Sequence, residues 1–214
     1  MANANYPCAS CPTDCTSLTL PAVVFDECPN IDSVEESEIC TIYLDTPDPA
    51  ANGCLPLNPI GTYTDTTGGT DDTVNVTVLT TWLTTAVDNT TVGSVREINV
   101  IGDKPEPEDT VKTISKRKQL IISRKHTLNI DVLELPHTNY EFMRKMQCGG
   151  SLFLWFRTIG GGFYGGENGI KVTIEKSFVQ FDRGEDASKT GILKFFWFND
   201  CDPPRDAFPI AQVC

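Results

Sequence analysis

The residues best suited to chemistry are the cysteines, which are concentrated at the start of the chain. Of the nine cysteines, six lie in the first quarter: Cys8, Cys11, Cys15, Cys28, Cys40 and Cys54. The first four of these could supply the thiolates of a tetrahedral zinc site, although the second CxxC pair usual in such sites is absent. The first ten residues lack the basic flank and apolar run of a secretory signal, so disulfides are not the default expectation. Structural zinc, disulfides formed after release into an oxidising medium, and free thiols stay open as alternatives.

The two histidines, His126 and His137, are the next candidates for catalysis or metal binding. His126 falls among the polar residues of a predicted strand, and His137 comes just before a predicted helix start. We therefore expect both side chains to lie near the surface. No motif of a P-loop, a zinc protease, a serine hydrolase or an EF-hand is present. The sequence predicts that the chain is not an enzyme and uses no cofactor.

A glycine-rich segment, residues 159–169, contains the spacing GxGxxG at Gly160, Gly162 and Gly165. In dinucleotide-binding proteins this motif precedes a helix whose N-terminus holds the pyrophosphate. The residues that follow here, 170–181, have the pattern of a strand and offer no helix N-terminus. The glycines therefore predict a flexible or tightly bent hairpin connection.

The net charge of −12 is distributed unevenly along the chain. Residues 1–110 contain 18 acidic and 2 basic residues, whereas residues 111–160 contain 3 acidic and 9 basic residues. The acidic and basic parts could attract one another between copies of the chain, or the acidic part could simply keep the chain soluble. An acidic chain is poorly suited to bind DNA, because duplex affinity depends on cations that meet phosphates. No apolar run approaches the roughly 20 residues that span a bilayer, so we expect no membrane insertion.

The clearest secondary-structure pattern lies in residues 125–157 and begins with a strand. Leu128, Ile130 and Val132 alternate with polar residues, as in a half-buried strand. The prominence of Thr, Val, Ile and Phe favours a mainly β protein. Similar runs predict further strands over residues 17–25, 38–44, 73–82, 94–101, 111–123, 151–157, 170–181 and 190–198.

One short helix is predicted over about residues 138–148. Thr138 and Glu141 match a capping box, in which each side chain bonds a free backbone N–H at the helix start. Gly149 and Gly150 supply the left-handed residue that ends a helix. Three apolar residues share one face of the helix: Phe142, Met143 and Met146.

These elements predict a β-sandwich or barrel of about seven to nine strands with one flanking α-helix and long loops. Residues 1–72 are predicted to form a Cys- and Asp-rich N-terminal arm with short strands and a long loop. Residues 73–200 would form the core, and residues 201–214 an extended, proline-rich tail.

Two charged groups are candidates for contacts between subunits. The loop over residues 45–72 is long, has no pattern of its own, and carries five aspartates: Asp45, Asp48, Asp65, Asp71 and Asp72. Three consecutive basic residues interrupt the run over 111–123: Lys116, Arg117 and Lys118. We interpret this basic trio as a solvated turn. A nucleic-acid contact is the weaker alternative, because no aromatic platform is interleaved with the cations.

The final predicted strand supplies a third candidate surface. It contains four consecutive aromatic residues, 195–198, which cannot all face one core because neighbours in a strand point to opposite sides. Phe196 and Phe198 are therefore predicted to lie on a face that meets another subunit.

Four segments carry a family resemblance: residues 98–107 (INVIGDKPEP), 125–131 (KHTLNID), 138–150 (TNYEFMRKMQCGG) and 159–169. Together with the order of the predicted elements, they resemble the tail tube proteins of long-tailed bacteriophages. They are similar in particular to virion proteins of phages that infect Bacteroidetes. The resemblance covers about 60% of the chain and is one of pattern, without a catalytic or binding motif.

The resemblance implies a homo-oligomer of stacked, hexameric rings. DNA would pass through their lumen without specific binding, and other phage structural proteins would be partners. It also implies assembly in the host cytoplasm and a final location in the virion tail. A capsid-associated or head-to-tail connector protein of a phage is the alternative. A small ligand-binding or enzymatic domain with the glycine-rich segment at its site is less favoured.

Overall fold

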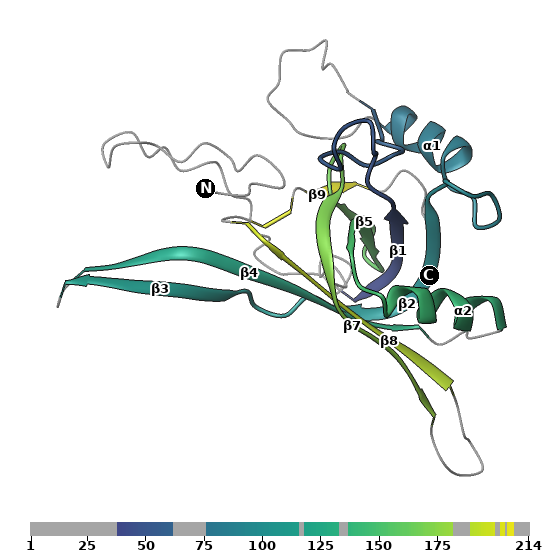
Figure 1. Cartoon of the computed structure of the whole chain (residues 1–214). Coiled ribbons are helices and arrows are strands. Elements are labelled where there is room, and N and C mark those ends of the chain that lie inside the picture. Colours follow the sequence, from purple (N-terminus) through teal and green to yellow (C-terminus); the bar gives the residue numbers. More distant parts are fainter. Residues whose placement is uncertain are drawn as a thin grey trace, which may run out of the picture.

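The computed structural model describes residues 38–61, 76–115, 118–132, 137–181, 189–199, 202–203 and 205–207 (Figure 1). Within these ranges nine strands form one sheet: β1 Ile39–Asp45, β2 Arg96–Asp103, β3 Glu108–Ser115, β4 Lys118–Val132, β5 Ser151–Thr158, β6 Gly162–Tyr164, β7 Ile170–Phe181, β8 Lys189–Phe198 and β9 Arg205–Ala207. The described residues also form two helices: α1 Val76–Thr85 and α2 His137–Met146.

Six of these strands close into an antiparallel barrel. Their order is β1-β2-β4-β8-β7-β5, and β5 pairs back with β1. Because β1 has a hydrogen-bonded neighbour on each side, this ring of strands has no free edge. Outside the ring, β3 pairs with β4, and β6 pairs with both β5 and β9. The predicted mainly β barrel is thus confirmed.

The interior of the barrel is filled by side chains from alternate positions of its strands. Leu128, Ile130 and Val132 of β4 are buried in the same apolar cluster as Phe195 and Trp197 of β8. The period-2 pattern of β4 therefore predicted its inward face correctly.

A second apolar cluster lies outside the barrel, between α1 and the strands β1 and β5. Tyr43 and Trp155 turn outward from these strands and meet Leu79 and Trp82 of α1. The ring centroids of Trp82 lie 5.7 Å from Tyr43 and 5.1 Å from Trp155. Because β1 and β5 are covered on both faces, consecutive residues of each strand are buried.

The strand predicted over residues 73–82 is wrong, because α1 occupies most of this segment and is a second helix. Its Thr and Val residues favoured a strand, but intrinsic β-propensity is readily overridden by packing. Leu79 and Trp82 are three positions apart, so they share the helix face that packs on the barrel. The Thr85 hydroxyl donates to the Thr81 carbonyl oxygen at 2.8 Å, so this polar group is satisfied inside the helix.

Helix α2 agrees with the predicted helix to within two residues at each end. Met143 is buried with the barrel core, whereas Phe142 is only partly buried. Thr138 lies within the helix, and Glu141 forms an ion pair with a residue one turn later, so the predicted capping arrangement does not form. The glycines at 149–150 have positive φ angles of 72° and 131° and follow the helix end as predicted.

The division of the chain also differs from the prediction at both ends. β1 falls in the predicted N-terminal arm, yet it is a barrel strand because it pairs with both β2 and β5. In the predicted C-terminal tail, β9 pairs with β6. Segments outside 73–200 therefore contribute to the main sheet.

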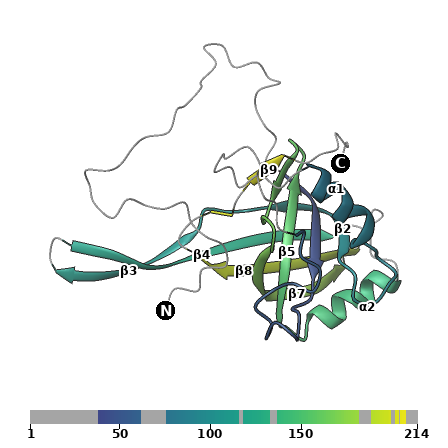
Figure 2. The same cartoon turned by 90° about the horizontal axis from the view of Figure 1, so that it is seen from above.

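A two-stranded arm projects from the barrel (Figures 1 and 2). It consists of β3 and the first half of β4, residues 118–124, because β8 pairs with β4 only from Lys125 onward. Near its base, the Arg124 guanidinium donates to both carboxylate oxygens of Asp109, at 2.7 and 3.1 Å. Such a bidentate pair holds the two strands in register.

Replacing Met143 by Ala should destabilise the protein by about 2–5 kcal/mol, because it leaves a cavity between α2 and the barrel core. Urea unfolding followed by circular dichroism would measure this loss. Phe142→Ala on the same helix serves as the control and should cost less, because Phe142 is only partly buried. An equal or larger loss for Phe142→Ala would contradict this account of the helix face.

Candidate functional site

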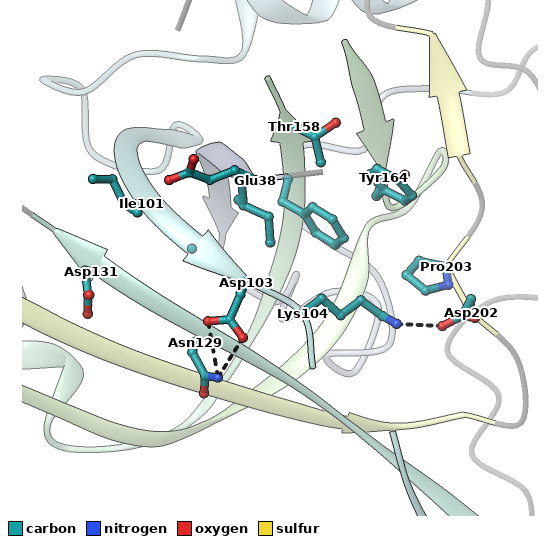
Figure 3. Close-up of a pocket in the computed structure, with 13 residues that line it drawn as sticks. Glu38, Ile101, Asp103, Lys104, Asn129, Asp131, Thr158, Tyr164, Asp202 and Pro203 are labelled. Carbon is teal, nitrogen blue, oxygen red and sulfur yellow. Dashed lines mark hydrogen bonds and ion pairs between the residues drawn. The ribbon is translucent and has the colours of Figure 1, made fainter. Parts of the chain in front are cut away.

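A cavity of about 710 Å³ that could receive a ligand lies at one rim of the barrel (Figure 3). It lies where the end of β2 meets β1, β4, β5, β6 and the segment 202–203. We call it the acidic pocket, and its lining residues are Glu38, Ile39, Ile101, Gly102, Asp103, Lys104, Asn129, Asp131, Phe156, Thr158, Tyr164, Asp202 and Pro203.

Four carboxylates line the acidic pocket, but only one of them is neutralised by a nearby cation. Asp202 pairs with Lys104 at 2.7 Å. Asp103 accepts a hydrogen bond from the neutral amide of Asn129 at 3.2 Å. Within the described part of the chain, no Lys or Arg forms an ion pair with Asp103, Glu38 or Asp131. The pocket therefore carries excess negative charge, which attracts cations.

The acidic pocket also has an apolar and aromatic side. The rings of Phe156 and Tyr164 stack with centroids 4.7 Å apart and planes 9° apart. Ile101 is 47% exposed. Where β2 crosses β4, a Cβ on Gly102 would lie 2.8 Å from the Asn129 carbonyl oxygen, so a glycine is required for this close approach. Carboxylates beside aromatic and aliphatic surface suit a cation with an apolar stem, such as a Lys or Arg side chain.

Next to the pocket, His126 is fully buried and contacts the segment that follows β8. Its ring stacks on Trp197, with centroids 5.1 Å apart and planes 7° apart. Nε2 lies 3.2 Å from the carbonyl oxygen of Asn199, and Nδ1 lies 3.6 Å from the Asp202 carboxylate. Burial, reinforced by the Lys104 ammonium, lowers the pKa of His126 despite that carboxylate.

The surface position predicted for His126 is therefore wrong. In a strand, residues two apart share a face, so His126 lies on the same side of β4 as the buried Leu128 and Ile130. His126 was predicted to face solvent because its side chain is polar. Its position in the alternation of β4, however, places it on the buried face. For His137, the structure describes only its place at the start of α2.

We expect the free energy of unfolding to fall as the pH is lowered from 7.5 to 5.5. The folded protein holds a proton on His126 less readily than the unfolded chain does, so stability is lost below the usual histidine pKa of about 6.5. His126→Phe keeps a flat ring on Trp197 and should flatten this dependence in urea titrations at several pH values. His137→Gln is the control and should retain it; an unchanged slope in His126→Phe would contradict the assignment.

The glycine-rich segment has a packing role in the structure. A Cβ on Gly165 or Gly169 would lie 2.7–2.8 Å from the indole ring of Trp155. The Trp155 Nε1–H donates to the Gly166 carbonyl oxygen at 2.8 Å. The segment leads into strand β7, as the sequence predicted, and it also contains the short strand β6, which was not predicted. Its glycines let the backbone enclose Trp155.

Substitution of Gly169 by Ala should be much more costly than substitution of Gly161. Both have positive φ angles, 69° and 83°, which disfavour Ala by about 1–2 kcal/mol. Only at Gly169 would the new Cβ also clash with Trp155, whereas nothing lies within 4 Å at Gly161. Thermal unfolding should show Gly169→Ala losing at least about 2 kcal/mol more than Gly161→Ala. Equal losses would mean that Trp155 moves aside freely.

The predicted surface role of Asp45 is wrong, since this side chain is only 2% exposed. Its carboxylate accepts hydrogen bonds from the backbone N–H groups of Thr46 at 2.8 Å and Asn58 at 2.6 Å. Burial raises the pKa of Asp45, and these hydrogen bonds oppose the shift. Asp45 therefore joins the end of β1 to the following loop. Asp48 caps the local turn by accepting from the Ala50 N–H at 2.8 Å.

The aromatic residues of β8 alternate as predicted. Phe195 and Trp197 point into the barrel, while Phe196 is partly exposed and Phe198 is 45% exposed. The two outer rings contact each other edge to face, with centroids 5.8 Å apart. The Lys125 ammonium lies 4.9 Å from the centroid of the Phe196 ring. The outer face of β8 is therefore aromatic, with the Lys125 ammonium beside it.

Several predicted residues lie outside the described part of the chain: Cys8, Cys11, Cys15, Cys28, Asp65, Asp71, Asp72, Lys116 and Arg117. Lys118 is described as the first residue of β4. Cys40 is disulfide-bonded, whereas Cys54 and Cys148 are free and exposed. Among the described residues, no group of three or more His, Cys, Asp or Glu side chains could hold a metal ion.

The arm exposes two apolar side chains among its described residues. Val111 is 47% exposed and Ile122 is 55% exposed. Thr110 pairs with Ser123 and Val111 pairs with Ile121, so Ile122 is the extra residue of a β-bulge in β4. Both side chains therefore face solvent in the single chain.

No family model, curated protein or solved structure matches this chain. No helix in the described ranges is long and apolar enough to cross a membrane. The acidic pocket was missed by sequence analysis, because its residues come from separate segments and no local spacing brings them together. The partial signal was the acidic bias of the first 110 residues.

Proposed function

We propose that this protein is a structural subunit that self-assembles, most specifically a tail tube subunit of a long-tailed bacteriophage. The observation that carries the proposal is the arm of β3 and β4. It extends away from a barrel whose own ring of strands is already closed. Among the described residues, the six strands of the barrel pair with one another in a closed ring that does not include β3.

Physical considerations support a partner for the arm. An isolated two-stranded ribbon is marginally stable in water, and unpaired strand edges invite pairing with another chain. The exposed apolar side chains of Val111 and Ile122 suit contact with a neighbouring subunit. In an assembly of identical subunits, a head-to-tail contact of this kind repeats until it closes a ring or extends as a filament.

In this proposal, rings of subunits stack into a tube through which the genome passes. The net charge of −12 favours a surface along which DNA slides without specific binding, because like charges repel. Other phage structural proteins would bind the ends of the tube. The subunit would assemble in the host cytoplasm and reside in the virion tail. The resemblance of the sequence to tail tube proteins gives the proposal its specific form.

Negative-stain electron microscopy and light scattering of the purified protein test the proposal. Rings or tubes are expected, and tubes distinguish a tail tube subunit from a connector, which would give single rings. A monomer at high concentration would overturn self-assembly.

Introducing charge on the arm should prevent assembly while leaving the barrel folded. The variant Val111→Asp with Ile122→Asp places two carboxylates at exposed positions of the arm, where burial against a neighbour would be costly. Light scattering should show at least about a tenfold loss of assembled protein. The matched control, Val92→Asp with Ile159→Asp, alters two exposed apolar residues in turns away from the arm. Equal assembly of the two variants would contradict a role for the arm.

A further inference from the structure

The outer face of the barrel along β2, β4, β8 and β7 is a continuous surface with exposed apolar side chains. Cross-strand pairing places one residue of each strand in a row across this face: Ile101, Asp131, Ile192 and Phe178. Ile101 is 47% exposed and Phe178 is 41% exposed. By contrast, α1 packs on the outward side chains of β1 and β5. Grouped exposed apolar side chains of this kind mark a surface that meets a partner.

A second row of side chains lies beside the first and changes the sign of its charge across the face. Its members, in the same strand order, are Asp103, Asn129, Lys194 and Lys176. We call Asp103 and Asp131, on β2 and β4, the acidic half of the face. Lys194 and Lys176, on β8 and β7, are the basic half. The acidic half is also one wall of the acidic pocket, because both of its aspartates line that cavity.

Neither half is neutralised within the described part of the chain. The two aspartates form no ion pair there, and neither does Lys176. Lys194 lies 3.1 Å from the Glu175 carboxylate, but Lys125 shares the same carboxylate at 3.0 Å. Three lysines against one glutamate leave a charge of +2, which is opposite and equal to the −2 of the two aspartates. The two halves are therefore complementary in charge.

The geometry of the barrel prevents the two halves from meeting within one subunit. Three strand spacings of about 4.8 Å separate Asp103 from Lys176, so their backbones lie roughly 14 Å apart along the wall. Six strands complete one turn of the barrel, so each strand turns the wall by about 60°. The two halves, two strands apart, thus point about 120° away from each other. Each half therefore faces a different neighbour.

We propose that the basic half of one subunit packs on the acidic half of the next, with Lys176 directed into that neighbour's acidic pocket. This inference rests on the proposed self-assembly and names the two surfaces that meet. The stacked rings of Phe156 and Tyr164 offer a surface to the aliphatic stem of the lysine, and the exposed Phe178 and Ile101 become buried in the same contact. The contact is heterologous, so it can propagate around a ring.

Charge reversal in each half tests this contact. The variants are Asp131→Lys and Lys176→Glu, at two exposed residues that form no ion pair within the described ranges. Each variant alone should raise the concentration for half-assembly, measured by light scattering, at least about tenfold, because like charges then face each other. Mixing the two variant proteins in equal amounts should restore assembly, because each contact in an alternating ring joins two original or two reversed residues. Both changes in one chain should restore it too.

The matched controls are Glu106→Lys and Lys145→Glu, which make the same charge changes at exposed residues outside these two rows. Each control should assemble as the wild type does. Circular dichroism and thermal unfolding of every variant check that the barrel is folded. A loss of assembly in the controls equal to that in the matched variants would mean that net charge alone matters, and would overturn the docking.

The remaining outcomes separate this inference from the proposed function. If the wild type assembles and both variants assemble equally well, the docking is overturned, self-assembly stands, and the face serves another partner. If the folded variants lose assembly and neither mixing nor the doubly changed chain restores it, the loss did not come from charge complementarity, and the docking is again overturned. If the wild type is itself monomeric at high concentration, the proposed function fails, and the docking fails with it.

Discussion

The pairing of β1 with both β2 and β5 is the constraint on which the rest of the structure depends. Without β1, the other five barrel strands would form an open sheet with edges at β2 and β5. The same strand has buried side chains on both faces, so it links the interior core to the cluster beneath α1. The Asp45 carboxylate then joins its end to the loop that follows. A single seven-residue strand thus sets the barrel, the α1 contact and the path of the next loop.

The sequence predicted those elements whose pattern is local. The alternation of Leu128, Ile130 and Val132 predicted the inward face of β4. The glycines after Met146 predicted the end of α2. Helix α1 could not be predicted in this way, because its Thr and Val residues favour a strand and only contact with Tyr43 and Trp155 outweighs them. Fold class therefore followed from periodicity, whereas one helix depended on tertiary packing.

The candidate site was less predictable than the fold for a physical reason. Glu38, Asp103 and Asp131 are far apart in the sequence and meet only after the barrel closes. His126 and Asp45 are polar residues with buried partners, and residue type alone places such residues at the surface. The hydrogen bonds and ring stacking that offset the cost of burying these polar side chains come from residues in loops or in distant parts of the sequence. The uneven distribution of charge along the chain was the part of the site that could be recognised from the sequence.

The position of β1 in the sequence has a consequence for how the chain folds during synthesis. Ile39 pairs with Thr158, so the last side of the barrel joins residues more than a hundred positions apart. At a synthesis rate of about 5–20 residues per second, β1 emerges from the ribosome roughly 6–20 s before β5 does. Until β5 has been synthesised, β1 can pair with β2 but has no partner on its other edge. Barrel closure is therefore a late, long-range event, and the incomplete chain carries an open strand edge that a chaperone or another nascent chain can meet first.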